Sequence, residues 1–320
     1  MKNSKDSKSS GGSMQAFDLI GDIHGYADEL RALLSHLGYE QRAGVYRHPD
    51  RMVIFLGDFV DRGPQIAEGL TIARSMVEAG TALAVMGNHE LNALAFHTPD
   101  PESPGEYLRR HTPKNVRQHA ATLDQLSPGD LASHLAWFRT LPLWLEFDGL
   151  RVVHACWDAE SVAAVGRADA ATEEGFVPAA CREGGELFKP VETLTKGKEA
   201  ALPADVYQLD GDGQPRNHFR LRWYTDARGQ TYRTYGLMNE PVACDEPLPA
   251  DVVAGAAPYP GPTLAPPVFI GHYGLRASAP TLLAANVACV DWGVASGGFL
   301  CAYRWDGERE LSPEKFVHTK

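Results

Sequence analysis

The sequence predicts an α/β fold in which helices connect the strands of a largely parallel sheet. Short apolar runs alternate with segments of helical spacing through the first third of the 320-residue chain. This alternation is typical of parallel sheets with right-handed crossovers. The apolar runs of the first and last thirds end in glycine followed by a polar side chain. Because ligands of open α/β sheets bind beyond the carboxyl ends of the strands, we expect the functional site at these exits.

The first third contains three strands and two helices in alternation. Residues 16–23 form a short strand that ends in glycine, and the helix that follows over 26–39 stops at another glycine. The next strand covers 52–56. A second helix lies within 63–80, with a proline near its start and a glycine as its end signal. Residues 81–88 form the third strand.

The middle of the chain departs from this alternation. Residues 91–140 are helical in pattern, polar and rich in histidine, and 151–155 predict another strand. Residues 160–220 are rich in alanine and glutamate and contain several prolines and glycines. This composition predicts a cap inserted into the α/β core.

The last third is expected to be mostly extended. The segment FRLRWYTDARGQTYRTYG (219–236) predicts a β-hairpin with its turn near 227–229. A proline-rich, irregular connection follows over 241–267. Residues 267–274 predict a strand that ends in Gly-His, and 286–307 predict a final hairpin that bends at a Gly-Gly pair.

The chain ends and the insertions define the expected domain organisation. Residues 1–13 are serine, lysine and glycine with no apolar residue after the first methionine. We expect a disordered leader or tag there, with Met14 as the native start. Residues 14–320 are expected to form a single domain, with insertions at about 92–147 and 160–235.

Charge and cysteine usage exclude several classes of protein. The net charge of −11 gives the chain no general electrostatic reason to bind nucleic acid, and a phosphate substrate would require local cations such as metal ions. Five scattered cysteines without a CxxC pair argue against a disulfide framework and suit a reducing compartment. No apolar stretch approaches membrane-spanning length, and no secretory signal is present. We therefore expect a cytoplasmic protein without a membrane partner.

Each strand exit supplies side chains that bind metals or phosphate. A lone aspartate at such a position could equally cap the helix that follows, so the argument depends on the whole set. The exits are GDIHG with Asp22 and His24, GDFVDRG with Asp58, Asp61 and Arg62, GNHE with Asn88 and His89, VVHAC with His154, and IGHYG with His272.

These side chains offer hard oxygen and borderline nitrogen ligands with no thiolate. Such a set favours manganese and also suits iron, zinc, nickel and magnesium. Asp22 and His24 face the same side because residues two apart along a strand do. Two divalent ions roughly 3.5–4 Å apart can share one carboxylate and clamp a displacement at phosphorus.

In this order, the motifs resemble those of the calcineurin-like metallophosphoesterases. More closely they are similar to the phosphoprotein-phosphatase superfamily, which includes serine/threonine phosphatases and bacterial diadenosine tetraphosphatases. The complete DRG and GNHE motifs carry this closer resemblance, and CVDWGVASGGFLCAYRW resembles the C-terminal strand pair of that family. The resemblance covers roughly residues 16–92, 148–158 and 268–305, and it implies a four-layer αββα sandwich with helical cap insertions.

The resemblance also implies a role for each motif residue. Two divalent metal ions are expected, with Asp58 shared between them. His89 would protonate the leaving oxygen, oriented by Asp61, and Arg62 would bind two phosphate oxygens as a planar fork. The implied metal ligands are Asp22, His24, Asp58, Asn88, His154 and His272.

A second phosphate-binding arginine is expected between the fourth and fifth motifs. The stretch RLRWY and its neighbours offer Arg220, Arg222, Arg228 and Arg233, of which we favour Arg222. The HAC sequence at the fourth exit departs from the HGG or HAG of close relatives. Cys156 could therefore lie near the metals, although a buried cysteine is usually a small apolar residue.

The remaining histidines and aromatic residues have plainer interpretations. Histidines at 97, 111, 119 and 134 are expected on the surface or in a cap, with one of them available to a substrate. Trp223 and Tyr224 are expected to be core residues and not a platform for stacking a base.

The resemblance implies hydrolysis of a phosphate monoester or phosphoanhydride by attack of a metal-bound hydroxide. We expect a phosphorylated small molecule or nucleotide as substrate, because the two insertions would narrow access to the metals. A serine/threonine protein phosphatase acting on a phosphoprotein is the alternative. A non-catalytic metal- or nucleotide-binding scaffold is a third hypothesis, which the complete set of ligands opposes. A nucleic acid is not expected as a partner, given the acidic charge.

Overall fold

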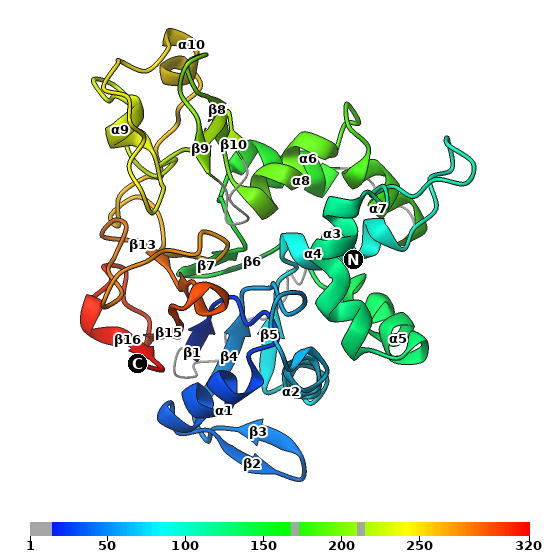
Figure 1. Cartoon of the computed structure of the whole chain (residues 1–320). Coiled ribbons are helices and arrows are strands. Elements are labelled where there is room, and N and C mark those ends of the chain that lie inside the picture. The colour runs from blue at the N-terminus through cyan, green and yellow to red at the C-terminus, as the bar shows by residue number, and fades with distance from the viewer. Residues whose placement is uncertain (1–14, 168–172, 210–214) are drawn as a thin grey trace.

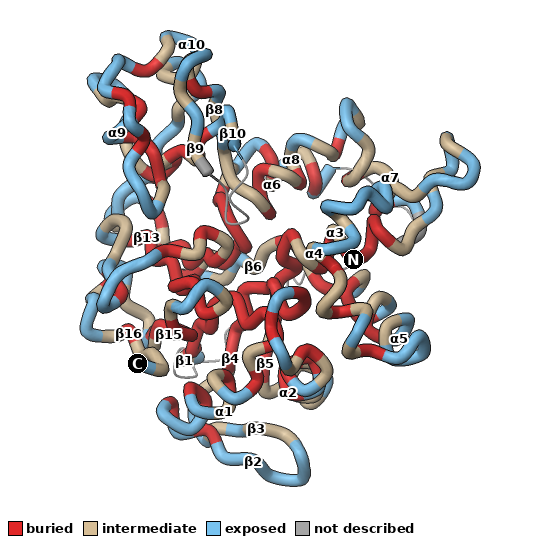
Figure 2. The backbone as a smooth tube through the Cα atoms, in the orientation of Figure 1, coloured by how far each residue is buried: buried red, intermediate tan, exposed pale blue. Residues whose placement is uncertain are grey.

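A computed structural model describes residues 15–167, 173–209 and 215–320 of the chain. Figure 1 shows two sheets near the centre, helices around them, and a separate lobe of short helices and strands. Figure 2 shows that buried residues are concentrated in the sheets and the loops that leave them. The expected leader, residues 1–13, and Met14 lie outside the described residues.

One half of the first sheet is parallel and the other half is antiparallel. Its order is β14 (Asp291–Trp292), β15 (Phe299–Trp305), β1 (Ala16–Ile20), β4 (Arg51–Phe55) and β5 (Ala82–Ala84), with β16 (Phe316–His318) also paired to β15. β1, β4 and β5 are parallel, whereas β15 is antiparallel to β1. The predicted succession of parallel strands in the first third of the chain is confirmed.

Two helices cover this sheet. α1 (Ala27–His36) contacts β15, α2 (Ile66–Glu78) contacts β5, and the helices contact each other. Acidic residues Asp28 and Glu29 in the first turn of α1 favour its N-terminus, and Leu30, Leu33 and Leu34 bury its apolar face. A small hairpin of β2 (Glu40–Arg42) and β3 (Val45–Arg47) follows α1.

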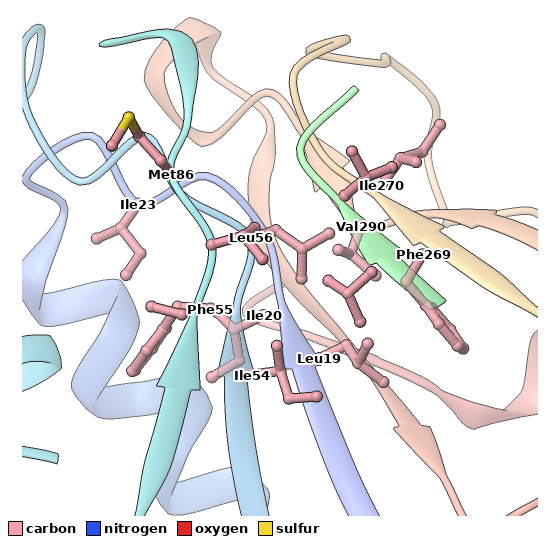
Figure 3. Close-up of a cluster of buried hydrophobic side chains, with 14 of the residues drawn as sticks. Leu19, Ile20, Ile23, Ile54, Phe55, Leu56, Met86, Phe269, Ile270 and Val290 are labelled. Carbon is pink, nitrogen blue, oxygen red and sulfur yellow. The ribbon is translucent and has the colours of Figure 1, made fainter. Parts of the chain in front are cut away.

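The second sheet is formed by strands from the middle and the end of the chain. Its order is β13 (Val287–Cys289), β12 (Val268–Ile270), β7 (Leu150–Val153) and β6 (Trp144–Phe147). β7, β12 and β13 are parallel, and β6 is antiparallel to β7. Figure 3 shows Leu19 and Ile54 of the first sheet in one cluster with Phe269 of the second, and all three are fully buried.

The C-terminal hairpin prediction is correct for only part of its range. β14 and β15 pair in antiparallel fashion around a bend at Ser296–Gly298, where η1 (Val294–Ser296) lies. β13, which precedes them, belongs to the second sheet. The chain therefore passes from one sheet to the other at Val290, whose backbone N–H donates to Ile270 O at 2.9 Å. η2 (Pro313–Lys315) leads into β16.

Helices fill the middle of the chain. Thr112 caps α4 (Pro113–Gln125) and Ser127 caps α5 (Pro128–Phe138) through their side-chain oxygens, and a proline occupies the first position of each helix. β6 lies inside the range 92–147 that we expected to be inserted, so the helical part of this range ends before Trp144. The other helices of this part of the chain are α3 (Asn88–Phe96), α6 (Ala159–Arg167), α7 (Glu173–Cys181) and α8 (Phe188–Lys196).

A lobe with its own hydrophobic cluster follows α8, and we call it the cap lobe (residues 199–209 and 215–257). Its elements are β8 (Glu199–Ala201), β9 (Gln208–Leu209), β10 (Pro215–Arg216), β11 (His218–Arg220), α9 (Tyr232–Tyr235) and α10 (Ala250–Ala254). Phe219, Tyr235 and Val242 lie at the centre of its buried cluster, which extends to Leu248.

The predicted hairpin over 219–236 is present only as one antiparallel bridge, between Leu221 and Gly236. β11 pairs instead with β8, and the second half of the segment forms the short helix α9. Thr231 and Thr234 cap this helix reciprocally through their side chains and backbone N–H groups. This local hydrogen bonding competes with strand formation and stops the extended pattern.

None of the helices in the described part of the chain combines the length and apolar character needed to cross a membrane.

A buried carboxylate connects three strands of the first sheet. Asp18 of β1 is fully buried and accepts hydrogen bonds from Arg51 of β4 at 3.0 Å, Arg304 of β15 at 3.1 Å and Tyr39 at 3.0 Å. Arg51 also donates to the backbone oxygens of Phe17 and Trp305. Ion pairs to Asp18 therefore join β1, β4 and β15 in addition to their backbone hydrogen bonds.

We predict that Asp18→Ala lowers the free energy of unfolding by about 3–5 kcal/mol, because it removes the buried carboxylate that Arg51 and Arg304 share, even though Arg51 keeps its ion pair with Asp306. Urea denaturation of the two proteins measures the change. Asp28→Ala is the matched control, since Asp28 pairs with Arg31 on an exposed helix face and should cost no more than about 1 kcal/mol. Equal effects of the two substitutions would contradict the prediction.

Candidate metal centre and catalytic site

The predicted strand exits meet at one edge of the two sheets and form two side-chain clusters. Ligand atoms of His24, Asp58 and His89 lie within 4.8 Å of one another, and so do those of Asp58, His154 and His272. Asp58 belongs to both clusters and is 2% exposed. One carboxylate therefore lies where two cations could share it.

Backbone carbonyls orient two of the histidines. The Nδ1–H of His24 donates to Val60 O at 2.8 Å, and that of His154 donates to Leu56 O at 2.6 Å. Both rings then carry their lone pair on Nε2, which lies 3.6 Å and 3.4 Å from the Asp58 carboxylate, respectively. Histidine ligands of metals are commonly fixed in this way by a hydrogen bond from the other ring nitrogen.

Asn88 and Asp22 complete the arrangement around His272. The Oδ1 atom of Asn88 lies 2.7 Å from His272 Nδ1 and 3.1 Å from His154 Nε2. Asp22 is in neither cluster, and its carboxylate accepts the backbone N–H of His272 at 3.0 Å. All six predicted metal ligands thus lie in one connected region, with Asp22 on the His272 side of it.

The backbone of the site is strained. Six described residues other than glycine have positive φ angles, and five of them are predicted site residues. Each such conformation costs of order 1–3 kcal/mol and persists only where the surroundings impose it. The five residues and their φ values are His24 at 46°, Asp58 at 52°, Asp61 at 68°, Arg62 at 69° and His272 at 70°.

Glu90 imposes part of this strained geometry. Its buried carboxylate accepts the backbone N–H groups of Asp58 at 2.7 Å, Phe59 at 2.8 Å and Gly87 at 3.0 Å. Burial, and then the Asp58 charge, raise the pKa of Glu90 to about 7, while the backbone donors act in the opposite direction. The last residue of GNHE therefore holds the loops after β4 and β5 together and does not face the cavity.

The electrostatics of the site fit bound cations. Burial, followed by the neighbouring Asp291, raises the pKa of Asp22 well above its usual range. Burial alone would lower the pKa of His154, but Asp58 and Asp22 outweigh it and raise this pKa to about 10. The carboxylates around His154 thus favour positive charge at this position. Divalent cations would supply that positive charge, and the nitrogen and oxygen donors suit them.

His89 and Asp61 form the predicted pair. His89 Nδ1 lies 2.6 Å from Asp61 Oδ2, and the backbone N–H of His89 donates to Asp58 Oδ1 at 2.9 Å. Burial alone would lower the pKa of His89, but the carboxylates of Asp58 and Asp61 outweigh it and raise this pKa. With its proton on Nδ1 directed to Asp61, the ring presents Nε2 to the cavity, 3.4 Å from Arg62 Nη2.

Two further partners of Asp61 come from α4 and were not predicted. His119 Nδ1 and Thr122 Oγ1 lie 2.8 Å and 2.6 Å from Asp61 Oδ1. We expected His119 in a cap or on the surface, but it is 4% exposed. The only sequence signal is that His119 and Thr122 are three residues apart, and therefore share one face of a helix.

The structure distinguishes Arg220 from Arg222, two of the four arginines considered for phosphate binding. Arg222 donates from Nε to the backbone oxygen of Gly236 at 3.0 Å, and it does not line the cavity above the metal clusters. Arg220 does line this cavity, and its Nε is buried without a hydrogen-bond partner. The Arg220 charge contributes, after burial, to the lowered pKa of His272. The geometry therefore favours Arg220 over the predicted Arg222.

Cys156 and Tyr224 lie in the core, and Trp223 is a core residue that also lines the cavity. Cys156 is fully buried, and burial raises the pKa of its thiol, as expected for a small apolar residue in a core. Trp223 and Tyr224 are each 4% exposed and belong to the main core. The Trp223 Nε1–H donates to Tyr273 Oη at 3.2 Å.

A cavity of about 2090 Å³ lies above the two clusters. His24, Asp58 and His89 lie in its wall, together with residues of α4, α8 and the cap lobe. Nine lysine and arginine side chains line it against seven carboxylates, although the whole chain carries a net charge of −11. Positive side chains therefore outnumber carboxylates by two in the cavity wall, and Lys196, Lys198 and Arg216 are paired with carboxylates. Its cations are Arg62, Lys114, Arg117, Lys189, Lys196, Lys198, Arg216, Arg220 and Arg276.

The chain belongs to the calcineurin-like phosphoesterase family. The sequence model of this family matches residues 16–176, which are half of the chain. This confirms the predicted family and the α/β fold class. The family implies a dinuclear centre of divalent metals, and the two clusters that share Asp58 offer its ligands.

Several curated relatives are named as tetraphosphatases. The asymmetrical bis(5′-nucleosyl)-tetraphosphatase PrpE of Halalkalibacterium halodurans is 50% identical over 74 residues, which cover 23% of this chain and 30% of that protein. The protein of the same name from Bacillus velezensis is 34% identical over 157 residues, covering 46% and 59%. The symmetrical bis(5′-nucleosyl)-tetraphosphatase of Methylococcus capsulatus is 28% identical over 316 residues, covering 93% and 95%.

The alignments to the first two relatives thus span 30% and 59% of their lengths. The more distant alignment to the Methylococcus protein extends over almost the entire length of both chains.

Gly271 provides a test of the metal-centre geometry. A Cβ atom there would lie 2.2 Å from Asp22 Oδ1, so Gly271→Ala must displace the carboxylate. We predict that this substitution weakens Mn²⁺ affinity roughly 10- to 100-fold, as expected when a group that orients a metal site is disturbed. Titration calorimetry with Mn²⁺ measures the change. Gly166→Ala in α6, where nothing lies within 4 Å, is the control, and a similar loss in that variant would refute the prediction.

Proposed function

We propose that the protein is a metal-dependent phosphohydrolase that cleaves phosphoanhydrides, with dinucleoside polyphosphates as its substrate class. The sharing of buried Asp58 by two histidine clusters, at the floor of a cation-lined cavity, is the observation that carries this proposal. The tetraphosphatase names of the relatives support the choice of a nucleotide substrate.

In this proposal the two clusters hold two divalent cations, with manganese favoured and iron, zinc, nickel or magnesium suited to the same donors. Asp58, which belongs to both clusters, would be shared by the two cations. When bound, the cations acidify water and neutralise phosphate charge. The remaining ligands are Asp22 and His24 for one cation, and Asn88, His154 and His272 for the other.

The remaining groups bind and protonate the substrate. Arg62 is exposed to the cavity and offers a planar fork to the reacting phosphoryl oxygens. Arg220 would bind the same group from the His272 side, because its unpartnered Nε gains a partner there. His89 holds one proton between Nδ1 and Asp61 and would deliver a second from Nε2 to the leaving oxygen.

The cavity supports an extended, highly charged substrate. Its volume of about 2090 Å³ exceeds the roughly 300–1,000 Å³ of pockets for drug-sized ligands. Arg117 of α4 and Lys189 of α8 stand in its wall beyond the metal clusters. They would attract the phosphates that are not being cleaved, and the cap lobe would cover a nucleoside.

The test is hydrolysis with Mn²⁺ of 4-nitrophenyl phosphate, diadenosine tetraphosphate and a phosphoserine peptide. We expect diadenosine tetraphosphate to have the highest kcat/KM, and we expect His89→Ala to lower its kcat roughly 100- to 10,000-fold through loss of the general acid. Chromatography of the products distinguishes symmetrical cleavage into two diphosphates from asymmetrical cleavage. High efficiency on the phosphopeptide alone would instead identify a protein phosphatase, and no activity on any substrate would support a scaffold.

The two cap arginines provide a matched pair of variants. We predict that Arg220→Gln lowers kcat for diadenosine tetraphosphate roughly 100- to 1,000-fold, because a preorganised donor to the developing charge is removed. Arg222→Gln should leave kcat close to that of the parent, because Arg222 donates to Gly236 and lies outside the cavity lining. Steady-state kinetics of both variants, with thermal melting as a check of folding, measure the effects. A larger loss of kcat in Arg222→Gln than in Arg220→Gln would instead identify Arg222 as the phosphate-binding arginine.

A further inference from the structure

The carboxylate of Asp61 has more hydrogen-bond partners than its pair with His89 requires. One oxygen, Oδ2, accepts from His89, while Oδ1 accepts from His119 at 2.8 Å and from Thr122 at 2.6 Å. The Thr122 hydroxyl also accepts the backbone N–H of Asp61 at 3.0 Å. Both oxygens and the backbone of Asp61 are therefore fixed, although its φ of 68° is unfavourable for an aspartate.

Two of these contacts come from the insertion between the third and fourth strand exits. His119 lies on α4 and is separated from Asp61 by 58 residues of sequence. Its ring is 5% exposed, so the hydrogen bond to Asp61 is shielded from competing water. Burial alone would raise the pKa of Asp61, but the hydrogen bonds from His119 and His89 outweigh it and lower this pKa. Asp61 is thus held as a carboxylate that can only accept hydrogen bonds.

The proton positions in this group follow from that constraint. Because Asp61 accepts, Nδ1 of His119 carries a proton, and in the neutral ring Nε2 is then an acceptor. His97 Nε2 lies 3.2 Å from His119 Nε2 and supplies the donor. Burial is the main cause that lowers the pKa of His97 to about 4, which suits a neutral ring in this position. The hydrogen bonds from His97 through His119, and the one from His89, thus converge on the Asp61 carboxylate.

We propose that His119 is a positioning residue for the general acid. It fixes the rotation of the Asp61 carboxylate, so that Oδ2 stays in line with His89 Nδ1 and the opposite ring nitrogen stays directed at the leaving oxygen. The proposal rests on the proposed function, and it gives the first insertion a role in catalysis in addition to its place in the cavity wall.

A purely structural role would have a different signature. A buried carboxylate needs partners whether or not it serves catalysis, so loss of His119 could simply loosen α4. Disorder in α4 would impair all substrates alike. A misdirected general acid would instead impair substrates in proportion to their need for a proton. The dependence of the rate on the leaving group therefore separates the two roles.

The experiment compares His119→Ala and His119→Asn with the parent on phenyl phosphate and 4-nitrophenyl phosphate, with Mn²⁺ present. Phenolate leaves poorly without a proton, whereas 4-nitrophenolate leaves readily. We expect His119→Ala to lower kcat on phenyl phosphate roughly 10- to 100-fold, the range found for groups that orient a functional ligand, with a much smaller loss on 4-nitrophenyl phosphate and unchanged KM. His119→Asn should recover most of the loss, because its amide nitrogen can donate in place of Nδ1.

His111→Ala is the matched control. His111 stacks on Phe96 in the same group of rings and lies 2.8 Å from the Phe96 backbone oxygen, but no contact joins it to Asp61. It should show no preference for either ester. In ¹⁵N-histidine spectra of the parent, His119 should appear as the Nδ1–H tautomer, and this readout does not depend on turnover.

The outcomes distinguish this proposal from the function on which it rests. Equal losses on the two esters, failure of His119→Asn to recover activity, or an Nε2–H tautomer of His119 would each overturn the positioning role and leave the proposed function intact. Absence of hydrolysis by the parent on both esters and on diadenosine tetraphosphate would overturn both. Thermal melting and Mn²⁺ content of each variant show whether it has kept its fold and its metal centre.

Discussion

The site depends on the placement of one carboxylate, that of Asp58, between two groups of histidines. It is 2% exposed and follows directly on the carboxyl end of β4, with a backbone φ of 52°. Glu90 fixes the backbone of Asp58 from one side, and the backbone N–H of His89 donates to its Oδ1 from the other. The strained turn, the buried charge and the close approach of β4 and β5 are therefore parts of a single constraint.

The predicted metal ligands come from both sheets, so the packing of the sheets determines the candidate site. β1, β4 and β5 place Asp22, Asp58 and Asn88, whereas β7 and β12 place His154 and His272. The shared core holds the carboxyl ends of the strands at one edge. Backbone hydrogen bonds such as Gly271 N–H to His154 O then set the spacing at that edge. A change in the packing of either sheet would therefore separate these side chains, because they come from distant parts of the sequence.

The insertions supply much of the cavity wall above this core. α4, α8 and the cap lobe supply most of the lysine and arginine side chains in that wall, and α4 also supplies His119 behind Asp61. Positive side chains slightly outnumber carboxylates there, although the whole chain is acidic. The hydrophobic cluster around Phe219 and Tyr235 lets the cap lobe hold its own shape next to the main core.

The sequence by itself determined the strand exits and the chemical types of the ligands, because parallel strands bring their carboxyl ends together wherever their helices pack. Only the tertiary structure decided that Arg220 and not Arg222 faces the cavity, that His119 reaches Asp61, and that 219–236 forms a single bridge and a short helix in place of a full hairpin. These outcomes depend on how an insertion packs back onto the core. That packing depends on burial and on hydrogen bonds between residues far apart in the chain. The local hydrophobic periodicity of the sequence does not reveal such contacts.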